Sequence, residues 1–167
     1  MARQPARSKM NERVYFDGKL VTVRTRDALL YAQALWQKRG KHHKKIRLSQ
    51  GSFNSSVAAS ANTHKGDGVF DAQTRGIGLT NAETVSLARA MADSGIAPFI
   101  RDERDGMGPH IHGLIIADPE MDPSAKQQVR DWDKGLNGLK NRAKDRTKYR
   151  PKVKLRFSWK QGKPVPR

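Results

Sequence analysis

Apolar positions follow the two-residue period of β-strands in several short segments of the chain. Residues 14–23 alternate around Asp17-Gly18, a dipeptide typical of a tight hairpin turn. The other segments are short runs rich in apolar residues, which is typical of strands within a sheet. These expected strands cover residues 46–50, 69–73, 97–101 and 111–117.

Longer segments show the spacing of amphipathic helices. The clearest helix is expected over residues 80–95, where Thr80 and Glu83 form a capping-box pattern and a glycine closes the segment. A second helix is expected over residues 25–40, with Thr25 as its N-cap. Both segments carry enough apolar positions on one side to pack against a sheet.

The order of these elements predicts the fold class. A last helix is expected over residues 122–135, where an N-cap aspartate precedes a proline. Residues 51–68 are rich in Ser, Asn, Gly and Thr and indicate an irregular loop. Strands and helices interleave without a regular strand-helix-strand rhythm. This favours an α+β fold, with a small, mostly antiparallel sheet and helices packed on one face.

Positive charge is confined to particular segments. The 167-residue chain has 33 Lys and Arg against 16 Asp and Glu, a net charge of +17. Residues 1–13 carry four basic groups, residues 36–47 carry six and residues 140–167 carry twelve, with only two acidic groups among them. The remainder is slightly acidic, with 11 basic and 14 acidic groups. The pattern predicts a domain over residues 14–145 between basic tails, and binding of anionic polymers through the basic segments.

Composition excludes several classes of protein. The chain has no cysteine, so disulfides and thiolate metal sites are excluded, and any metal must be held by His, Asp, Glu or water. No apolar run approaches the roughly 18 residues of a membrane span. The basic N-terminal residues are not followed by the apolar segment of a secretory signal.

The five histidines differ in their surroundings. His42 and His43 lie in the basic run GKHHKK with no carboxylate nearby, which favours a solvated or polyanion-facing loop. His64 lies in a Gly-rich loop, THKGDGVFD, that ends on Asp71 at the start of an expected strand. A loop histidine followed by such a carboxylate allows both side chains to converge on one point. Asp67 in the same loop is a competing carboxylate.

His110 and His112 stand two residues apart at the head of the apolar strand PHIHGLIIA, so both side chains face the same side. Catalytic zinc takes three protein ligands, commonly His and carboxylate, and keeps a fourth position for water. His64, Asp71 and one of the two strand histidines supply such a set. The other strand histidine would lie beside the metal, placed to orient water or stabilise an oxyanion.

These motifs together resemble the zinc peptidase superfamily that includes D-alanyl-D-alanine carboxypeptidases, L-alanyl-D-glutamate endolysins, lysostaphin-like enzymes and the hedgehog fold. Its hallmark is a His, an Asp seven residues later and a distant His, and His64 and Asp71 have this spacing. The stretches QGSFNSSVAASANTHKGDGVFDAQTRG and PHIHG are similar to the actinobacterial and actinophage branch. The resemblance covers about residues 14–140 and omits both tails.

The resemblance implies a role for each matching residue. His64, Asp71 and His112 match the zinc ligands, and His110 matches the auxiliary catalytic histidine of lysostaphin-like relatives. Many carboxypeptidase relatives have a glutamate shortly before the last ligand as general base. This chain has glycine and proline there, which favours a histidine-assisted mechanism.

Two further residues are candidates for substrate binding. Gln50, at the end of a strand, and Arg75, just past Asp71, are placed to bind the carboxylate or carbonyl of a peptide. For both residues an ordinary structural role, as a loop-capping glutamine and a surface arginine, is an equally open interpretation.

The function expected from the resemblance is zinc-dependent cleavage of a peptidoglycan amide bond by a phage-encoded endolysin or virion-associated enzyme. Its expected partners are peptidoglycan, anionic polymers and other phage virion proteins. Its expected location is the virion, or the host cytoplasm before release to the cell wall. The alternatives are a virion structural protein with weak or no catalysis, a basic nucleic-acid-binding protein suggested by the charge, and, less favoured, a metal nuclease.

Overall fold

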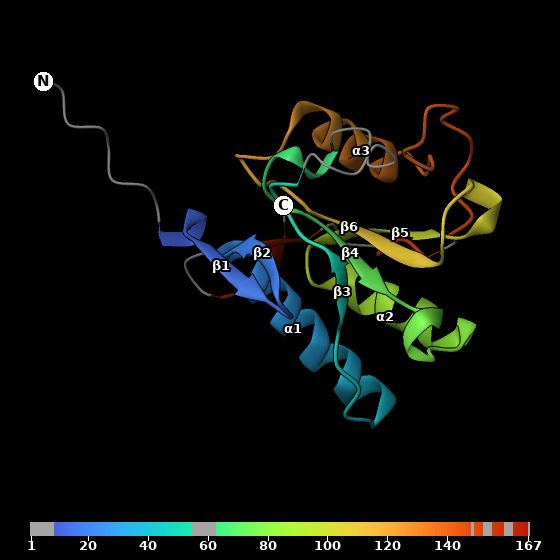
Figure 1. The fold of residues 1–167 in the computed structure, drawn as a ribbon, viewed down its shortest axis with the longest axis horizontal. Coiled ribbons are helices and arrows are strands. Elements are labelled where there is room, and N and C mark those ends of the chain that lie inside the picture. Colours follow the sequence, from blue (N-terminus) through green and yellow to red (C-terminus); the bar gives the residue numbers. More distant parts are fainter. Residues whose placement is uncertain (1–8, 55–62, 148, 152–154, 159–161, 167) are drawn as a thin grey trace, which may run out of the picture.

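A four-stranded antiparallel sheet forms the centre of the protein in the computed structural model, with strand order β3-β4-β6-β5 (Figure 1). The structure describes residues 9–54, 63–147, 149–151, 155–158 and 162–166. The strands of the sheet are β3 (Leu48–Gln50), β4 (Val69–Gln73), β5 (Ile96–Arg101) and β6 (His110–Ile115). All neighbouring pairs are antiparallel, so the predicted α+β class with a mostly antiparallel sheet is confirmed.

Helices cover both faces of this sheet. The two longer helices, α1 (Val23–Gly40) and α2 (Asn81–Asp93), pack together on one face, as expected, whereas α3 (Pro123–Asp133) lies across the other (Figure 1). None of the helices in the described residues is long and apolar enough to cross a membrane.

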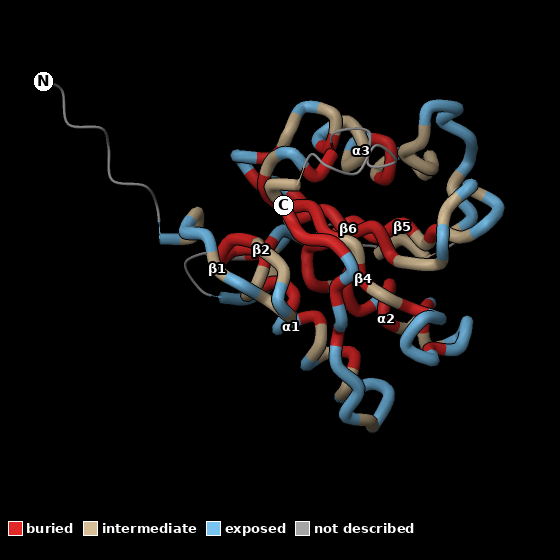
Figure 2. The backbone as a smooth tube through the Cα atoms, viewed as in Figure 1, coloured by how far each residue is buried: buried red, intermediate tan, exposed pale blue. Residues whose placement is uncertain are grey.

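The alternation of side chains along the strands divides the core in two. Phe70 of β4 and Ile111 of β6 belong to the cluster formed with α1 and α2. Val69 and Leu114 point the other way and belong to the cluster formed with Ala125 and Trp132 of α3. Burial is concentrated along the central strands and the helix sides that face them (Figure 2). The strands therefore have two buried faces, and any polar residue on them requires a partner.

A second antiparallel pair precedes α1. β1 (Arg13–Phe16) and β2 (Lys19–Thr22) are joined by the predicted turn at Asp17-Gly18, where both residues have positive φ angles, 49° and 71°. Such angles define the tight hairpin turn and favour glycine. The predicted N-terminal tail, residues 1–13, is not fully separate from this strand pair. Arg13 lies in β1, and Lys9–Asn11 forms a short 3-10 helix, η1. Residues 1–8 of that tail lie outside the described residues.

The predicted helix starts are confirmed in two cases and corrected in one. Thr80 and Glu83 form a reciprocal capping box on α2, and Asp122 caps α3 by accepting from the N–H of Ser124. For α1 the N-cap is Thr22 rather than Thr25, because the extended backbone of β2 ends at Thr22 and its hydroxyl accepts from the Thr25 N–H.

The boundary predicted at residue 145 is corrected by the packing of the segment that follows. Phe157 lies in β7 (Leu155–Ser158), pairs with β8 (Lys163–Pro166), is 1% exposed and joins the cluster formed with α1 and α2. A Cβ atom at Gly95 would lie 2.8 Å from the Phe157 backbone nitrogen, so the chain passes close by at this point. The Tyr149 hydroxyl also donates to Asp93 at 2.6 Å. The described part of residues 146–167 is therefore part of the domain.

Truncation of Phe157 gives a direct measure of this packing. We expect Phe157→Ala to lower the free energy of unfolding by about 3–5 kcal/mol, because it removes a fully buried aromatic ring. Tyr15→Ala is a matched control, since Tyr15 is 72% exposed. Urea denaturation of both variants measures the free energies of unfolding. Equal and small losses of stability in the two variants would support the interpretation of residues 146–167 as a tail.

Candidate metal centre

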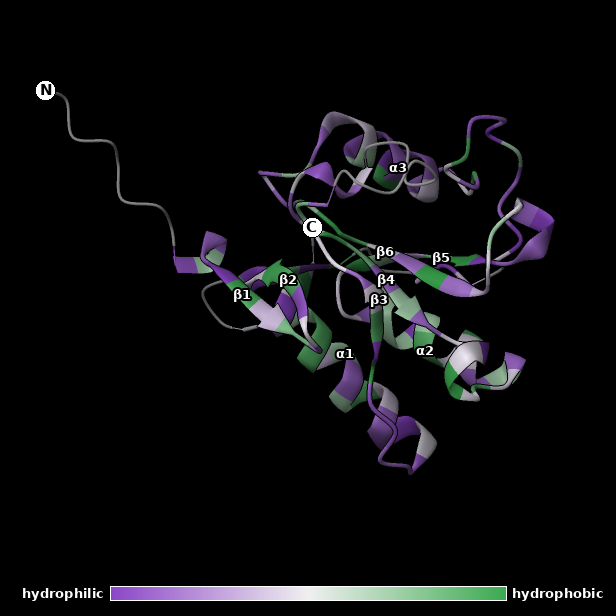
Figure 3. Ribbon diagram, in the orientation of Figure 1, coloured by the Kyte–Doolittle hydropathy of each residue, from purple (hydrophilic) through white to green (hydrophobic). Residues whose placement is uncertain are grey.

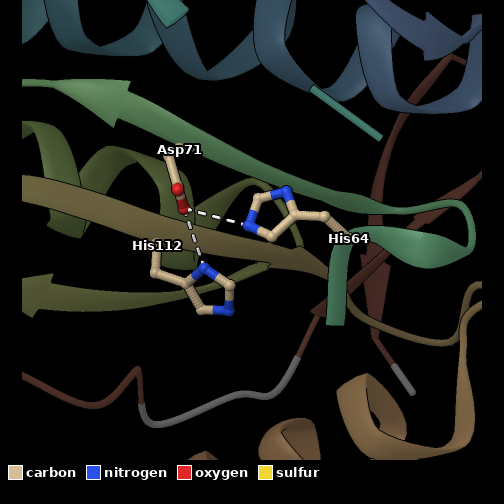
Figure 4. Close-up of side chains that lie close together, drawn as sticks. All are labelled: His64, Asp71 and His112. Carbon is tan, nitrogen blue, oxygen red and sulfur yellow. Dashed lines mark hydrogen bonds and ion pairs between the residues drawn. The ribbon is translucent and has the colours of Figure 1, made fainter. Parts of the chain in front are cut away.

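Three side chains converge on the face of the sheet that α3 covers (Figure 4). His64 lies in η3 (Thr63–Lys65), Asp71 in β4 and His112 in β6. Asp71 and His112 are direct cross-strand partners, so their side chains stand on the same face. Asp71 Oδ1 lies 3.3 Å from Nε2 of His64 and 2.8 Å from Nδ1 of His112. The potential ligand atoms all lie within 4.8 Å of one another, so the cluster can hold a metal ion.

Burial and charge set the ionisation of the cluster. Burial opposes ionisation of Asp71, but the hydrogen bonds and charges of His112 and His64 outweigh it and hold the pKa of this carboxyl well below its usual value. Burial lowers the pKa of His112, although its hydrogen bond with Asp71 acts in the opposite direction. At neutral pH the cluster therefore presents an ionised carboxylate and a neutral His112, which are the forms that bind metals.

In each histidine, the ring nitrogen that points away from Asp71 faces a carbonyl oxygen. Nδ1 of His64 lies 2.8 Å from the backbone oxygen of Gly51, and Nε2 of His112 lies 2.8 Å from Oε1 of Gln128. The amide nitrogen of Gln128 donates to the backbone oxygen of Gly138 at 3.0 Å, which fixes the orientation of the amide. A carbonyl oxygen can only accept, so each of these two ring nitrogens donates a proton to the oxygen that it faces.

One nitrogen of each ring is thereby directed at the carboxylate of Asp71. Nε2 of His64 and Nδ1 of His112 both face Asp71 Oδ1, so a proton on these nitrogens or a bound cation can offset the negative charge of the carboxylate. Two imidazoles and one carboxylate form a donor set typical of catalytic zinc. The residues present thus fit a bound divalent metal.

Gln128 is expected to control metal affinity through the orientation of His112. Gln128→Leu removes the acceptor for the His112 Nε2–H, and we expect zinc affinity to fall by about 10- to 100-fold, whereas Gln128→Glu keeps an acceptor and most of the affinity. Gln127→Leu is the control, because the Gln127 side chain bonds Asp131 and Arg130 instead. Competition with a zinc-binding dye measures the zinc affinities. Equal affinities for Gln128→Leu and Gln127→Leu would show that Gln128 does not control metal binding.

A pocket of about 420 Å³ opens onto the metal ligands. His110 lines it, and Nε2 of His110 lies 3.8 Å from Asp71 Oδ1. Nδ1 of His110 lies 2.7 Å from the backbone oxygen of Gly108 and donates to it. His110 thus stands beside the metal ligands with its Nε2 directed toward Asp71. The predicted substrate-binding residue Gln50 also lines this pocket and is 9% exposed.

The other candidates from the sequence lie elsewhere. Arg75 follows the end of β4 in η4 (Arg75–Ile77), is ion-paired with Glu103 and lines a neighbouring cavity rather than the metal pocket. Arg75 is therefore separated from the metal pocket, because the chain leaves the sheet after Gln73, and its role in substrate binding stays a prediction. His42 stacks edge-on against Trp36 at the far end of α1 and takes no part in the cluster.

Asp67, the competing carboxylate, belongs to a separate buried cluster. It is 0% exposed and accepts from the Thr22 hydroxyl at 2.9 Å, and Arg24 lies between Asp67 and Asp118 at 3.4 and 3.3 Å. These contacts join the loop that carries His64 to the start of α1. Asp67 thus positions the loop and does not contribute to the metal cluster.

This second cluster has a testable pH dependence. Burial and the neighbouring Asp67 raise the pKa of Asp118 from 3.8 to about 7. The folded state holds this proton more tightly than the unfolded state, so the stabilising contribution is complete below pH 3.8 and is lost as the pH rises through about 7. We expect the thermal midpoint of metal-free protein to fall, relative to Asp118→Asn, between about pH 4 and pH 7. Parallel midpoint curves for the two proteins would contradict this assignment.

Comparison with protein-family models finds no match, and comparisons with curated proteins and with solved structures find no significant match. The fold and the site therefore define the class of this protein only as a small α+β domain with a candidate His-Asp-His metal centre. The family suggested by the sequence motifs stays a prediction.

Proposed function

We propose that the protein is a zinc-dependent peptidase that cleaves an amide bond in the stem peptide or cross-bridge of bacterial peptidoglycan. The observation that carries this proposal is the convergence of two histidine nitrogens and one carboxylate in the lining of a single pocket. The similarity of the surrounding motifs to peptidoglycan peptidases supports the choice of substrate.

The residues around the site have separable tasks in this proposal. His64, Asp71 and His112 would hold the metal, and zinc, when bound there, supplies polarisation of the amide carbonyl and acidification of a water. Nε2 of His110 accepts the proton of the attacking water and returns it to the leaving amine. Gly51 and Gln128 hold the rings of His64 and His112 in the orientation that metal binding needs.

The basic segments would attach the enzyme to its substrate. The end of α1 and the loop after it are hydrophilic and project away from the sheet (Figure 3). Lys38, Lys41 and Lys45 are exposed there. Cell-wall polymers carry phosphate and carboxylate groups, so such a loop would hold the protein on the wall. A phage origin, as an endolysin or a virion-associated enzyme beside other virion proteins, is part of the proposal.

A nucleic-acid-binding protein is the second candidate, and the net charge of +17 favours it. Nucleic-acid binding through basic side chains does not require the metal pocket. The two candidates are therefore distinguished by whether the metal centre is needed.

Digestion of purified peptidoglycan tests the proposal. Zinc-loaded protein should release fragments whose masses identify one type of cleaved amide bond, and chelation of the metal should stop the release. Protein that contains stoichiometric zinc but releases no fragments, and that binds duplex DNA with a steep salt dependence, would favour the second candidate.

A further inference from the structure

A larger cavity lies next to the metal pocket. It has a volume of about 630 Å³ and lies at the end of the sheet, between the start of α2 and the turn that joins β5 to β6. Arg101, the last residue of β5, lines both cavities and is paired across the sheet with His110. A ligand held at the metal can therefore extend past Arg101 into the larger cavity.

The wall of this cavity carries an excess of positive charge. Five arginines line it against two carboxylates, Asp102 and Glu103. Three of the arginines are neutralised, because Arg75 pairs with Glu103, Arg104 with Asp102, and Arg146 with Asp102 and Asp105. Among the described residues, Arg89 and Arg101 have no carboxylate within ion-pair distance, although Asp105, Asp145 and Asp71 act on the charge of Arg101 from further away.

Arg101 is the more unusual of the two. It is 3% exposed, its guanidinium lies over the Phe99 ring at 4.6 Å, and its Nη2 has no hydrogen-bond partner among the described residues. This nitrogen is also shielded from solvent, so water does not replace the missing acceptor. A buried, unpaired guanidinium is costly to fold, and such groups gain most from an anionic ligand.

We propose that Arg101 and the cavity behind it bind a carboxylate group of the substrate, and so select peptides that carry a free carboxylate near the cleaved amide. The proposal rests on the proposed peptidase function. Guanidinium and carboxylate form paired, charge-assisted hydrogen bonds, and Arg101 lines both cavities, so its side chain borders a ligand bound in either one. Apolar atoms of Val85 and Ile100 in the same wall suit the aliphatic part of a peptide better than a phosphate.

Amidation of the substrate tests this selection. Soluble peptidoglycan fragments are digested by zinc-loaded protein before and after their free carboxylates are converted to amides with carbodiimide and ammonia. Wild type should cleave the native fragments about 10- to 100-fold faster, because one charge-assisted interaction is lost on amidation. Arg101→Gln should cleave both at the slower rate. Arg130→Gln is the charge-matched control, because Arg130 is exposed on α3 and lines neither cavity.

The result is decisive in either direction. Equal rates for native and amidated fragments in wild type, or an undiminished preference in Arg101→Gln, would overturn the proposal. If Arg101→Gln does not fold, Arg101→Lys takes its place. It keeps the buried charge but lacks the paired donors, so it should lose most of the preference.

A second measurement separates this proposal from the peptidase function. Acetate is titrated into metal-free protein, and backbone amide signals of residues that line the larger cavity are followed by NMR. Saturable shifts in wild type and Arg130→Gln, absent in Arg101→Gln, would support a carboxylate site even if peptidoglycan is not cleaved. Identical shifts in all three proteins would assign the anion binding to other groups and overturn the role of Arg101.

Discussion

Replacing His64 or His112 with alanine should abolish stoichiometric zinc binding. Each substitution removes one of three converging ligands and leaves a two-ligand site, which holds zinc too weakly to survive purification. Asp71→Asn should have the same effect, because the neutral amide removes the only carboxylate among the three. Elemental analysis after zinc-supplemented expression measures the metal content.

The control for this series is His43→Ala, which removes a histidine from the exposed basic loop after α1. It should retain one zinc per chain. Full zinc occupancy in either His64→Ala or His112→Ala would show that the ligand assignment is wrong. Absence of zinc from the wild-type protein would reject the peptidase proposal as a whole.

His110→Ala should keep its zinc and lose activity on peptidoglycan by on the order of 100-fold or more, as for removal of a catalytic acid–base group. The reason lies in the geometry of the ring. Its Nδ1 is held by the Gly108 carbonyl, and its Nε2 faces the pocket 3.8 Å from the carboxylate oxygen of Asp71. Zinc content and the rate of fragment release, measured on one preparation, provide the test.

Two other outcomes for His110 are informative. Loss of zinc would mean that His110 and His112 have exchanged roles. Unchanged activity with full zinc content would assign the proton transfer to another group.

The sequence predicted most of the secondary structure because the relevant signals are local. The Thr80–Glu83 capping box, the Asp17-Gly18 turn and the apolar strand after His112 each depend on neighbouring residues. The grouping of His64 with Asp71 was also predictable, since a short Gly-rich loop joins them. His112 could be placed on the correct side of its strand by alternation alone.

What the sequence could not predict depends on contacts between distant segments. Gln128 reaches His112 only because α3 packs across the sheet, and helical spacing does not specify which strand residue a helix side chain will meet. Arg101 could be placed on the same side as Phe99, but its lack of a partner depends on packing. Apolar residues alternate with polar ones around Phe157, which allows a strand there, but the contact of Phe157 with the core formed by α1 and α2 depends on packing between distant segments.

The pairing of β4 with β6 has a consequence for the order of folding. Asp71 and His112 are 41 residues apart in the chain and meet only through this strand pair. A metal held by both residues would therefore require closure of the long loop that spans α2 and β5, a slow step compared with helix formation. A metal that binds only the folded state would then slow unfolding of the central strands. Metal-free protein would form the same sheet but unfold faster.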